Sequence, residues 1–356
     1  MDFLVKDAMK NEEQFSSEES RIGHANIKIF GCGGAGSNMV SWLYKKGISG
    51  AKILACNTDK QHLDITEADT KFLIGSSITR GLGCGGYPQK GAEAAKESIN
   101  EIKGVLKETD MIFVCAGMGG GTGTGSAPIV AKLAKDNGAI VIGTVTMPFK
   151  IERARIDKAE FGLQQLREVS DTVIVIDNNR LVKIAGNLPV QQAFAVANEL
   201  ISTMIKGIVE TIAVPSLVNL DFADVRAIMT NGGVAAIGVG SSDTQQRALE
   251  AVEGALSNPL LDISYEGATG ALIHIEGGPE MTLEEVEQIG NKVTSSLDED
   301  ANVIWGARVS DEMKGKLTVM TIITGVNSPW ILGKKTEESR QAEINRLGNE
   351  LDLNML

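Results

Sequence analysis

The chain has 356 residues, of which 43% are hydrophobic and 22% are charged, a composition typical of a soluble globular protein long enough for two packed domains. Its formal net charge of −12 disfavours nucleic-acid binding and direct binding to an anionic membrane, because either would need a basic face. No apolar run reaches the roughly 20 residues of a membrane span and the first residues lack the apolar core of a secretory signal, so we expect a cytoplasmic protein without direct membrane insertion.

The first half of the chain has the pattern of an α/β sheet. Residues 1–25 are expected to form a flexible arm, and residues 26–188 a domain in which short apolar segments alternate with helix-like stretches. This alternation predicts a mostly parallel, Rossmann-like sheet flanked by helices, with a ligand site where the strands end. Strands are predicted at residues 27–30, 52–56, 111–116, 139–145 and 172–176, and helices at 37–46, 91–108, 127–136 and 157–170.

The second half predicts a long helix and a smaller domain. Residues 189–214 are expected to form a central connecting helix, because apolar residues recur there at helical spacing. Residues 215–332 are expected to form an α+β domain, and residues 333–356 a short tail. Helices of this domain are predicted at residues 244–256 and 283–297, and strands at 271–276, 302–307 and 317–323.

The first glycine loop, GCGGAGSN, directly follows the first predicted strand. Gly31, Gly33 and Gly36 match the GxGxxG pattern, and Asp59 lies roughly 20 residues further on, where the ribose-binding acid of a dinucleotide site is found. On its own this loop would indicate an NAD-type Rossmann oxidoreductase. The first glycine loop alone does not exclude an oxidoreductase.

A second glycine loop, GMGGGTGTGSAP, has no place in a simple dinucleotide-binding unit. It follows another apolar strand and leads into a helix, so its N–H groups, the Thr122 and Thr124 hydroxyls and the helix N-terminus can all face phosphate oxygens. Neither loop has the lysine of a Walker motif. A third glycine-rich segment at residues 79–91 could fold over the outer end of a triphosphate.

No metal or nucleophile site is predicted from the cysteines and histidines. The four cysteines include no CxxC pair, which favours reduced, buried thiols, and the three histidines are scattered, with neither metal-ligand spacing nor a Ser-His-Asp pattern. The net charge of −12 further implies that an anionic ligand is held by backbone N–H groups, helix N-termini and a bound cation rather than by a basic surface.

The glycine loops belong to a series of eight motifs. In chain order these are GCGGAGSN, NTD at residues 57–59, TRGLGCGG, GGGTGTG at 119–125, MPF at 147–149, DNN at 177–179, FAVAN at 194–198 and NLDFADVR at 219–226. Together they resemble the motifs of the tubulin/FtsZ superfamily, most nearly those of FtsZ, over residues 26–333. The short tail is similar to that of archaeal members.

The resemblance implies the tubulin/FtsZ fold and a GTP-dependent polymerising GTPase. Such a protein forms head-to-tail protofilaments, hydrolyses GTP to GDP and phosphate on assembly, uses Mg²⁺, and builds the scaffold of the division ring at mid-cell. Two alternatives remain: a tubulin-like filament for DNA segregation or cell shape, which would use the same site, and the oxidoreductase.

The resemblance also implies nucleotide-binding residues. Guanine would stack on Phe194 and hydrogen-bond to Asn178 and Asn198; Phe194 and Asn198 are four apart on one predicted helix and so share a face. Glu152 and Arg155 are candidates in a segment that is one residue shorter than the family pattern. The remaining contacts, mainly to phosphate, would come from Gly33, Gly34, Ala35, Asn38, Asn57, Cys84, Gly85, Gly86, Gly119, Gly120, Gly121, Thr122, Gly123, Thr124 and Gly125.

Two carboxylates in NLDFADVR are the catalytic candidates. Asp221 and Asp224 suit the start of a helix, as N-cap and first-turn residues. The resemblance implies a second role, in which they and Asn219 reach the nucleotide of the neighbouring subunit and orient the attacking water. Hydrolysis would then depend on head-to-tail contact between identical subunits.

Other partners are implied for the tail. Ile344, Leu347 and Leu351 lie at helical spacing and could dock in a groove of a membrane-tethered adaptor, although a frayed helix would have the same pattern. An FtsZ paralogue is a further possible partner.

Three residues depart from the family pattern. Arg153 stands where the family has glycine, Cys84 where alanine is usual, and Tyr87 where a small polar residue is common. We expect the contact to the outer phosphate to be modified accordingly.

Overall fold

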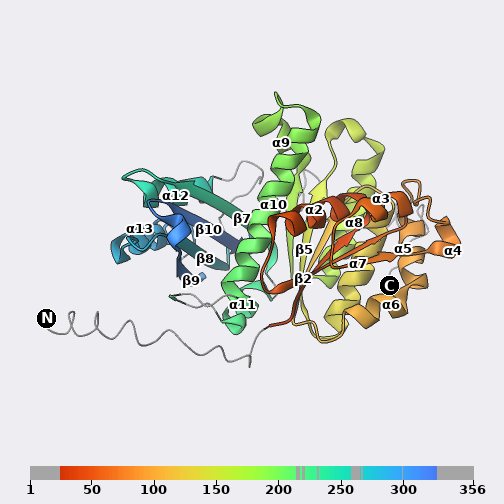
Figure 1. Cartoon of the computed structure of the whole chain (residues 1–356), viewed down its shortest axis with the longest axis horizontal. Coiled ribbons are helices and arrows are strands. Elements are labelled where there is room, and N and C mark those ends of the chain that lie inside the picture. Colours follow the sequence, from red (N-terminus) through yellow and green to blue (C-terminus); the bar gives the residue numbers. More distant parts are fainter. Residues whose placement is uncertain are drawn as a thin grey trace, which may run out of the picture.

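The computed structural model describes residues 25–213, 217–218, 221–230, 232–257, 265, 268–298 and 300–326 (Figure 1). The described strands form one ten-stranded sheet in the order β3-β2-β1-β4-β5-β6-β7-β10-β8-β9. Helix α10 (Val190–Ala213) runs between the N-terminal and C-terminal halves (Figure 1). The prediction of a mostly parallel sheet with flanking helices and a long central helix is confirmed.

The N-terminal half contains six parallel strands. They are β1 (Ile27–Cys32), β2 (Ala51–Asn57), β3 (Thr70–Leu73), β4 (Met111–Gly117), β5 (Ile140–Met147) and β6 (Thr172–Asp177). The helices between them are α2 (Gly33–Lys46), α3 (Lys60–Ile65), α4 (Ser76–Thr79), α5 (Pro88–Glu97), α6 (Ile99–Val105), α7 (Thr122–Asp136) and α8 (Ala154–Val169). All residues of β1 are buried, as expected for a parallel strand covered on both faces. Short β3 was not predicted.

Several helix predictions in this half were wrong in their bounds. The single helix predicted at residues 91–108 is two helices that meet at Ser98, α2 begins at Gly33 instead of residue 37, and α7 begins at Thr122 instead of residue 127. A Cβ added to Gly125 would lie 2.1 Å from the Pro88 carbonyl oxygen, and one added to Gly91 would lie 2.3 Å from the Gly121 carbonyl oxygen. These glycines therefore allow α5 and α7 to pack closely, and part of the glycine run is helix.

The C-terminal half continues the same sheet. Helix α9 (Asn178–Ala185) follows β6 and precedes α10. The elements after α10 are α11 (Phe222–Met229), β7 (Gly233–Ser242), α12 (Arg247–Leu256), β8 (Gly270–Gly277), α13 (Leu283–Thr294), β9 (Asn302–Val309) and β10 (Leu317–Thr324). Strand β7 pairs in parallel with β6 and antiparallel with β10, so it joins the two halves. It was not predicted because its glycines interrupt any alternation. A Cβ on Gly238 would lie only 1.6 Å from the Ala255 carbonyl oxygen, so α12 packs directly on this strand's backbone.

Helix α10 belongs to the core. Ile201, Met204, Ile205 and Ile208 are buried against the sheet in the same apolar cluster as residues of α2 and α11. Each such side chain contributes roughly 1.5–3 kcal/mol by leaving water. At its exposed side, Glu199 accepts hydrogen bonds from Trp42 Nε1 (2.7 Å) and Lys46 Nζ (2.6 Å) of α2. Helix α10 is thereby fixed to the helix that follows the first glycine loop.

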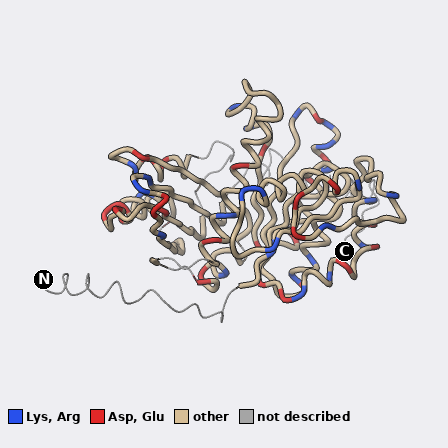
Figure 2. Tube along the Cα trace, in the orientation of Figure 1, with Lys and Arg blue, Asp and Glu red and all other residues tan. Residues whose placement is uncertain are grey.

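Charge is mixed over the surface. Figure 2 shows acidic residues interspersed with basic ones in both halves of the described chain. Within the residues that the structure describes, no helix combines the length and the apolar character that crossing a membrane requires.

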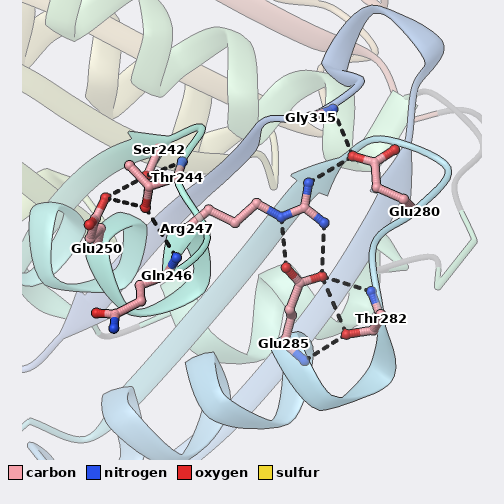
Figure 3. Close-up of polar contacts among 9 residues, drawn as sticks. All are labelled: Ser242, Thr244, Gln246, Arg247, Glu250, Glu280, Thr282, Glu285 and Gly315. Atoms are coloured by element: carbon pink, nitrogen blue, oxygen red, sulfur yellow. Dashed lines mark hydrogen bonds and ion pairs between the residues drawn. The ribbon is translucent and has the colours of Figure 1, made fainter.

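Two ion pairs of the buried Arg247 connect elements of the C-terminal half (Figure 3). Arg247, at the start of α12, is only 8% exposed; its Nε and Nη2 donate to Glu285 at 2.7 and 3.1 Å, and its Nη1 donates to Glu280 at 2.7 Å. Glu280 also accepts from the Gly315 N–H at 2.7 Å. Arg247 therefore connects α12 to α13, to the segment before α13 and to the turn before β10. The pairing lowers the pKa of both carboxyls, that of Glu280 to about 2.

Arg153 has a backbone conformation that favours glycine. Its φ is +33° at the junction between the turn Lys150–Glu152 and α8, the position at which the family pattern has glycine. We expect Arg153→Gly to raise the free energy of unfolding by about 1 kcal/mol, because relief of this strain outweighs the added chain entropy. Urea unfolding of both proteins measures the change.

Lys150→Gly is the matched control for that experiment. Lys150 lies in the adjacent turn with an ordinary backbone, so glycine there should lower stability by roughly 0.5–1 kcal/mol. Equal destabilisation by both substitutions would contradict strain at Arg153.

Candidate functional site

The loops that carry the predicted site meet at one edge of the sheet. In the strand register, Cys32 at the end of β1 pairs with Cys56 of β2 and with Ala116 of β4, and Met147 of β5 pairs with Asp177 of β6. Because these strands are parallel, the segments after them start side by side at the carboxyl edge. The fold therefore brings together the first glycine loop, the second glycine loop with its GGGTGTG motif at residues 119–125 (the signature loop), and the segments after β2, β5 and β6.

Helix α2 presents an open N-terminus at this edge. It begins at Gly33 directly after β1; its N-cap residue Cys32 makes no side-chain capping bond, and its first turn has no acidic residue. Gly34, Ala35 and Asn38 are exposed there. The uncapped N–H groups and the positive end of the helix dipole suit an anion.

Helix α7 presents a second open N-terminus beside the first. It also has no side-chain cap and no acid in its first turn. A Cβ on Gly33, whose φ is +68°, would lie 2.6 Å from the Gly123 nitrogen, so the two loops touch where only glycine fits. Thr124 Oγ1 accepts from the Gly119 N–H at 3.0 Å and so shapes the signature loop. Two helix N-termini at one point form a strong site for a polyphosphate.

The third glycine loop is connected to the signature loop through hydroxyl groups. Thr58, just after β2, places Oγ1 2.6 Å from Thr122 Oγ1 and 3.3 Å from Cys84 Sγ. A Cβ on Gly121 would lie 2.6 Å from Cys84 Cβ, so the loops are in direct contact. Cys84, Gly85 and Gly86 therefore lie beside the segment Gly119–Gly125, as the site prediction requires.

The segment after β5 packs on the signature loop from the other side. A Cβ on Gly119 would lie 2.7 Å from the Arg155 carbonyl oxygen. Arg155 Nη1 donates to Glu152 Oε2 at 2.6 Å, and Glu152 Oε1 accepts from the Phe149 N–H at 2.9 Å. Both candidate residues thus lie beside the loop, although their contacts to a nucleotide stay a prediction.

An apolar cavity of about 310 Å³ lies next to these loops, between α9 and the start of α10. Its lining includes Phe149 and Phe194, whose rings meet edge to face with centroids 6.0 Å apart, and Phe194 is 42% exposed. Asn178 is the first residue of α9, and Asn198 is one turn after Phe194 on α10. An exposed aromatic ring beside an apolar cavity suits a purine base, and the contacts of the two asparagines to such a base stay a prediction.

Asn57 is buried under the site. Its side-chain oxygen accepts from the Thr58 and Asp59 N–H groups at 2.9 and 3.3 Å. It therefore shapes the turn after β2, and direct contact with a ligand stays a prediction.

The acidic candidates lie away from this edge. Asp221 and Asp224 cap α11: Asp221 Oδ1 accepts from the Asp224 N–H at 2.8 Å, and Asp224 Oδ2 accepts from the Asp221 N–H at 3.4 Å. Arg226 of the same helix donates to the Gly138 carbonyl at 3.3 Å, next to the amino end of β5. Since β5 has eight residues, α11 is about 25 Å from the glycine loops. Asn219 lies outside the described residues.

Sequence reasoning missed two residues that shape this edge. Thr58 joins three loops, and Lys158 of α8 donates from Nζ to the Gly86 carbonyl oxygen at 2.8 Å. Thr58 lies inside the NTD motif and could have been noted. Lys158 carried no signal, because its partner lies 72 positions earlier in the chain.

The cysteines are packing residues at this edge. Cys32, Cys56, Cys84 and Cys115 are buried, and burial raises the pKa of Cys115 to about 12, so its thiol stays protonated. Among the described residues, no group of three or more His, Cys, Asp or Glu side chains is placed to bind a metal.

The oxidoreductase hypothesis is not favoured. Asp59, the candidate ribose-binding acid, instead caps α3 by accepting from the His62 N–H at 3.1 Å. The second uncapped helix N-terminus also has no role in a simple dinucleotide fold.

Comparisons with known proteins agree with the geometry. Residues 26–186 match the family model "Tubulin/FtsZ family, GTPase domain", and residues 233–327 match "FtsZ family, C-terminal domain". The chain is 56% identical over 340 residues to "Cell division protein FtsZ 2" of Methanocaldococcus jannaschii, covering 95% of this chain and 90% of that protein. It is 49% identical to the Haloferax volcanii protein of the same name, covering 99% and 92%.

A solved structure gives the same result. The structure titled "FtsZ dimer, empty (M. jannaschii)" has a TM-score of 0.80 and 47% identity, covering 90% of this chain and 92% of that one. The chain therefore belongs to the FtsZ family of tubulin/FtsZ GTPases.

Proposed function

We propose that this protein polymerises head to tail with bound GTP, hydrolyses GTP between subunits, and forms the scaffold of a division ring. The observation that carries the proposal is the separation of the two halves of the site. The glycine loops lie at the carboxyl edge of the parallel strands, and Asp221 and Asp224 lie at α11 near the amino end of β5. Only a second subunit can bring such carboxylates to the phosphates.

The glycine loops and the cavity beside Phe194 would bind GTP. The N-termini of α2 and α7 would hold the α- and β-phosphates, and the Cys84–Gly86 loop would cover the γ-phosphate. Guanine would stack on Phe194 and pair with Asn178 and Asn198. Mg²⁺, bound with the nucleotide beside the glycine loops, would offset the charge of the phosphates.

Hydrolysis would need the second half from the neighbouring subunit. There Asp224 and Asp221, with Asn219, would accept hydrogen bonds from the attacking water and hold it in line with the γ-phosphate. A free subunit lacks these groups at its own loops, so its turnover should be slow. Each subunit would have one edge that carries the glycine loops and an opposite edge that carries Asp221 and Asp224, the acidic edge. The contact between these two different edges can repeat from subunit to subunit without forming a closed ring, which gives a filament.

Location and further partners belong to the same proposal. The relatives are named as cell division proteins. We propose that this protein acts in the cytoplasm at the division site, where residues 333–356, outside the described residues, would bind a membrane-tethered adaptor. An FtsZ paralogue would share the filament.

The decisive experiment measures GTP hydrolysis with Mg²⁺ against protein concentration, with light scattering in parallel. We expect specific activity to rise above a critical concentration, together with scattering, because the site is completed between subunits. Activity independent of concentration would overturn the shared site.

Guanine stacking is tested by Phe194→Ala. We expect about tenfold weaker binding of GDP and GTP alike, because base stacking on an aromatic ring contributes on the order of 1–3 kcal/mol. Leu249→Ala, which removes a comparably exposed apolar side chain on α12, is the control and should change affinity by less than about twofold. Equal effects would argue against stacking. Equilibrium titration of fluorescent nucleotides below the critical concentration measures both.

A further inference from the structure

The backbone of the third glycine loop is only weakly constrained by the loop's own residues, because four of them are glycines with positive φ. Gly81, Gly83, Gly85 and Gly86 have φ values of +76°, +82°, +60° and +78°. Glycine is the residue that loses most conformational freedom on ordering, so such a loop needs contacts from outside. Its first part is held by the Lys60 N–H, which donates to the Gly81 carbonyl oxygen (3.0 Å), and by the Gly83 N–H, which donates to the Thr58 carbonyl oxygen (3.1 Å). Around Gly85 and Gly86, the Tyr87 N–H donates to the Cys84 carbonyl oxygen (3.2 Å).

Lys158 supplies an outside contact at the tip. Its Nζ donates to the Gly86 carbonyl oxygen at 2.8 Å and lies 5.4 Å from the centroid of the Tyr87 ring. The Gly86–Tyr87 peptide is therefore held at both of its polar atoms, by Lys158 at the oxygen and by the Cys84 carbonyl at the nitrogen. A charged donor makes this the stronger of the two bonds.

Helix α8 consequently contacts two phosphate-binding loops. Arg155, in its first turn, packs against Gly119 of the signature loop, and Lys158, one turn later, bonds to the third loop. We propose that Lys158 is a positioning residue that sets the Gly85–Gly86 backbone for the γ-phosphate and so separates GTP from GDP. This rests on the proposed GTPase function and adds the residue that makes the site respond to the third phosphate.

The structure offers a charge-matched comparison in Lys90. Its Nζ lies 5.5 Å from the centroid of the same Tyr87 ring, on α5. Lys90→Met and Lys158→Met each remove one positive charge and one cation–π contact beside the loop. Lys158→Met additionally removes the hydrogen bond from Lys158 to the Gly86 carbonyl oxygen, which Lys90→Met leaves in place. The difference between the variants therefore measures the effect of that bond.

The experiment compares GDP with a GTP analogue that has an imido bridge between the β- and γ-phosphates. Dissociation constants are measured with Mg²⁺ below the critical concentration for wild type, Lys158→Met, Lys158→Arg and Lys90→Met. For Lys158→Met we expect about tenfold weaker binding of the analogue and a change in GDP affinity within about twofold, because one charge-assisted hydrogen bond shapes only the outer-phosphate loop. Lys90→Met should weaken the analogue less than about threefold, and Lys158→Arg should restore most of the loss.

The outcomes separate this inference from the function on which it rests. If wild type binds neither nucleotide, the proposed function fails and the inference with it. If wild type binds both, an equal loss of GDP and analogue in Lys158→Met would indicate a structural role and overturn the inference alone. Equal effects of Lys158→Met and Lys90→Met would do the same by assigning the effect to charge.

Discussion

Asp224→Asn should reduce GTP turnover in assembled protein by about 100-fold while leaving nucleotide affinity unchanged, because a carboxylate that orients water acts only on the neighbouring subunit's γ-phosphate. Asparagine keeps an oxygen that can accept from the Asp221 N–H, so the cap of α11 is largely retained. Phosphate release per subunit above the critical concentration measures turnover. Glu101→Gln, a first-turn acid of α6, is the matched control and should hydrolyse GTP at the wild-type rate.

Mixing two inactive variants tests the shared site directly. Gly33→Ala should not bind nucleotide, because its Cβ would lie 2.6 Å from the Gly123 nitrogen and the residue needs φ of +68°. Its acidic edge remains intact, so it can complete the pocket of an Asp224→Asn subunit. Activity that appears on mixing would support catalysis between subunits, whereas a mixture as inactive as its components would count against it.

Arg247→Met should lower the free energy of unfolding by about 2 kcal/mol. The substitution leaves Glu285, which is 20% exposed at its side chain, without its charged partner, and such a loss is more costly than the loss of a surface pair. Urea unfolding measures the change. Lys292→Met breaks the exposed pair with Glu253 at 3.1 Å and is the matched control, with an expected change below about 1 kcal/mol.

The ion pairs of Arg247 with Glu280 and Glu285 also predict that the free energy of unfolding depends on pH. Hydrogen bonds from Arg247 depress the pKa of Glu280 to about 2 and also lower that of Glu285, from an ordinary value of 4.5. Depressed carboxyl pKa values add stability above the ordinary value, and this stability is lost as the pH falls toward the depressed one. The stability difference between wild type and Arg247→Met should thus shrink below pH 4.5; a difference that stays constant down to pH 2 would contradict this assignment.

Much of the fold could be predicted because its signals are local. Apolar runs predicted the strands from β1 to β6 apart from β3, and helical spacing predicted α10. Strand β7 was missed because its glycines are explained only by α12, which packs on them from later in the chain. The early start of α7 was missed for a similar reason, since Gly125 looks like loop sequence until α5 is seen against it.

The sequence predicted which loops form the site, but it did not predict which side chains of those loops contact one another. The glycine motifs predicted which segments would lie at the carboxyl edge, and Arg153 was correctly identified as standing at a glycine position. The Thr58–Thr122 and Lys158–Gly86 contacts join residues 64 and 72 positions apart and have no pattern in the sequence. Such pairings are set by the meeting of distant loops, so only the structure shows them.

The placement of α11 near the amino end of β5 gives any filament of this protein a direction. Every subunit would point the same way, so one end would expose a filled nucleotide pocket and the other an acidic edge with nothing to act on. The terminal subunit with the exposed pocket would keep its GTP until another subunit docks on it. A filament would then carry one unhydrolysed subunit at that end whether or not it is growing.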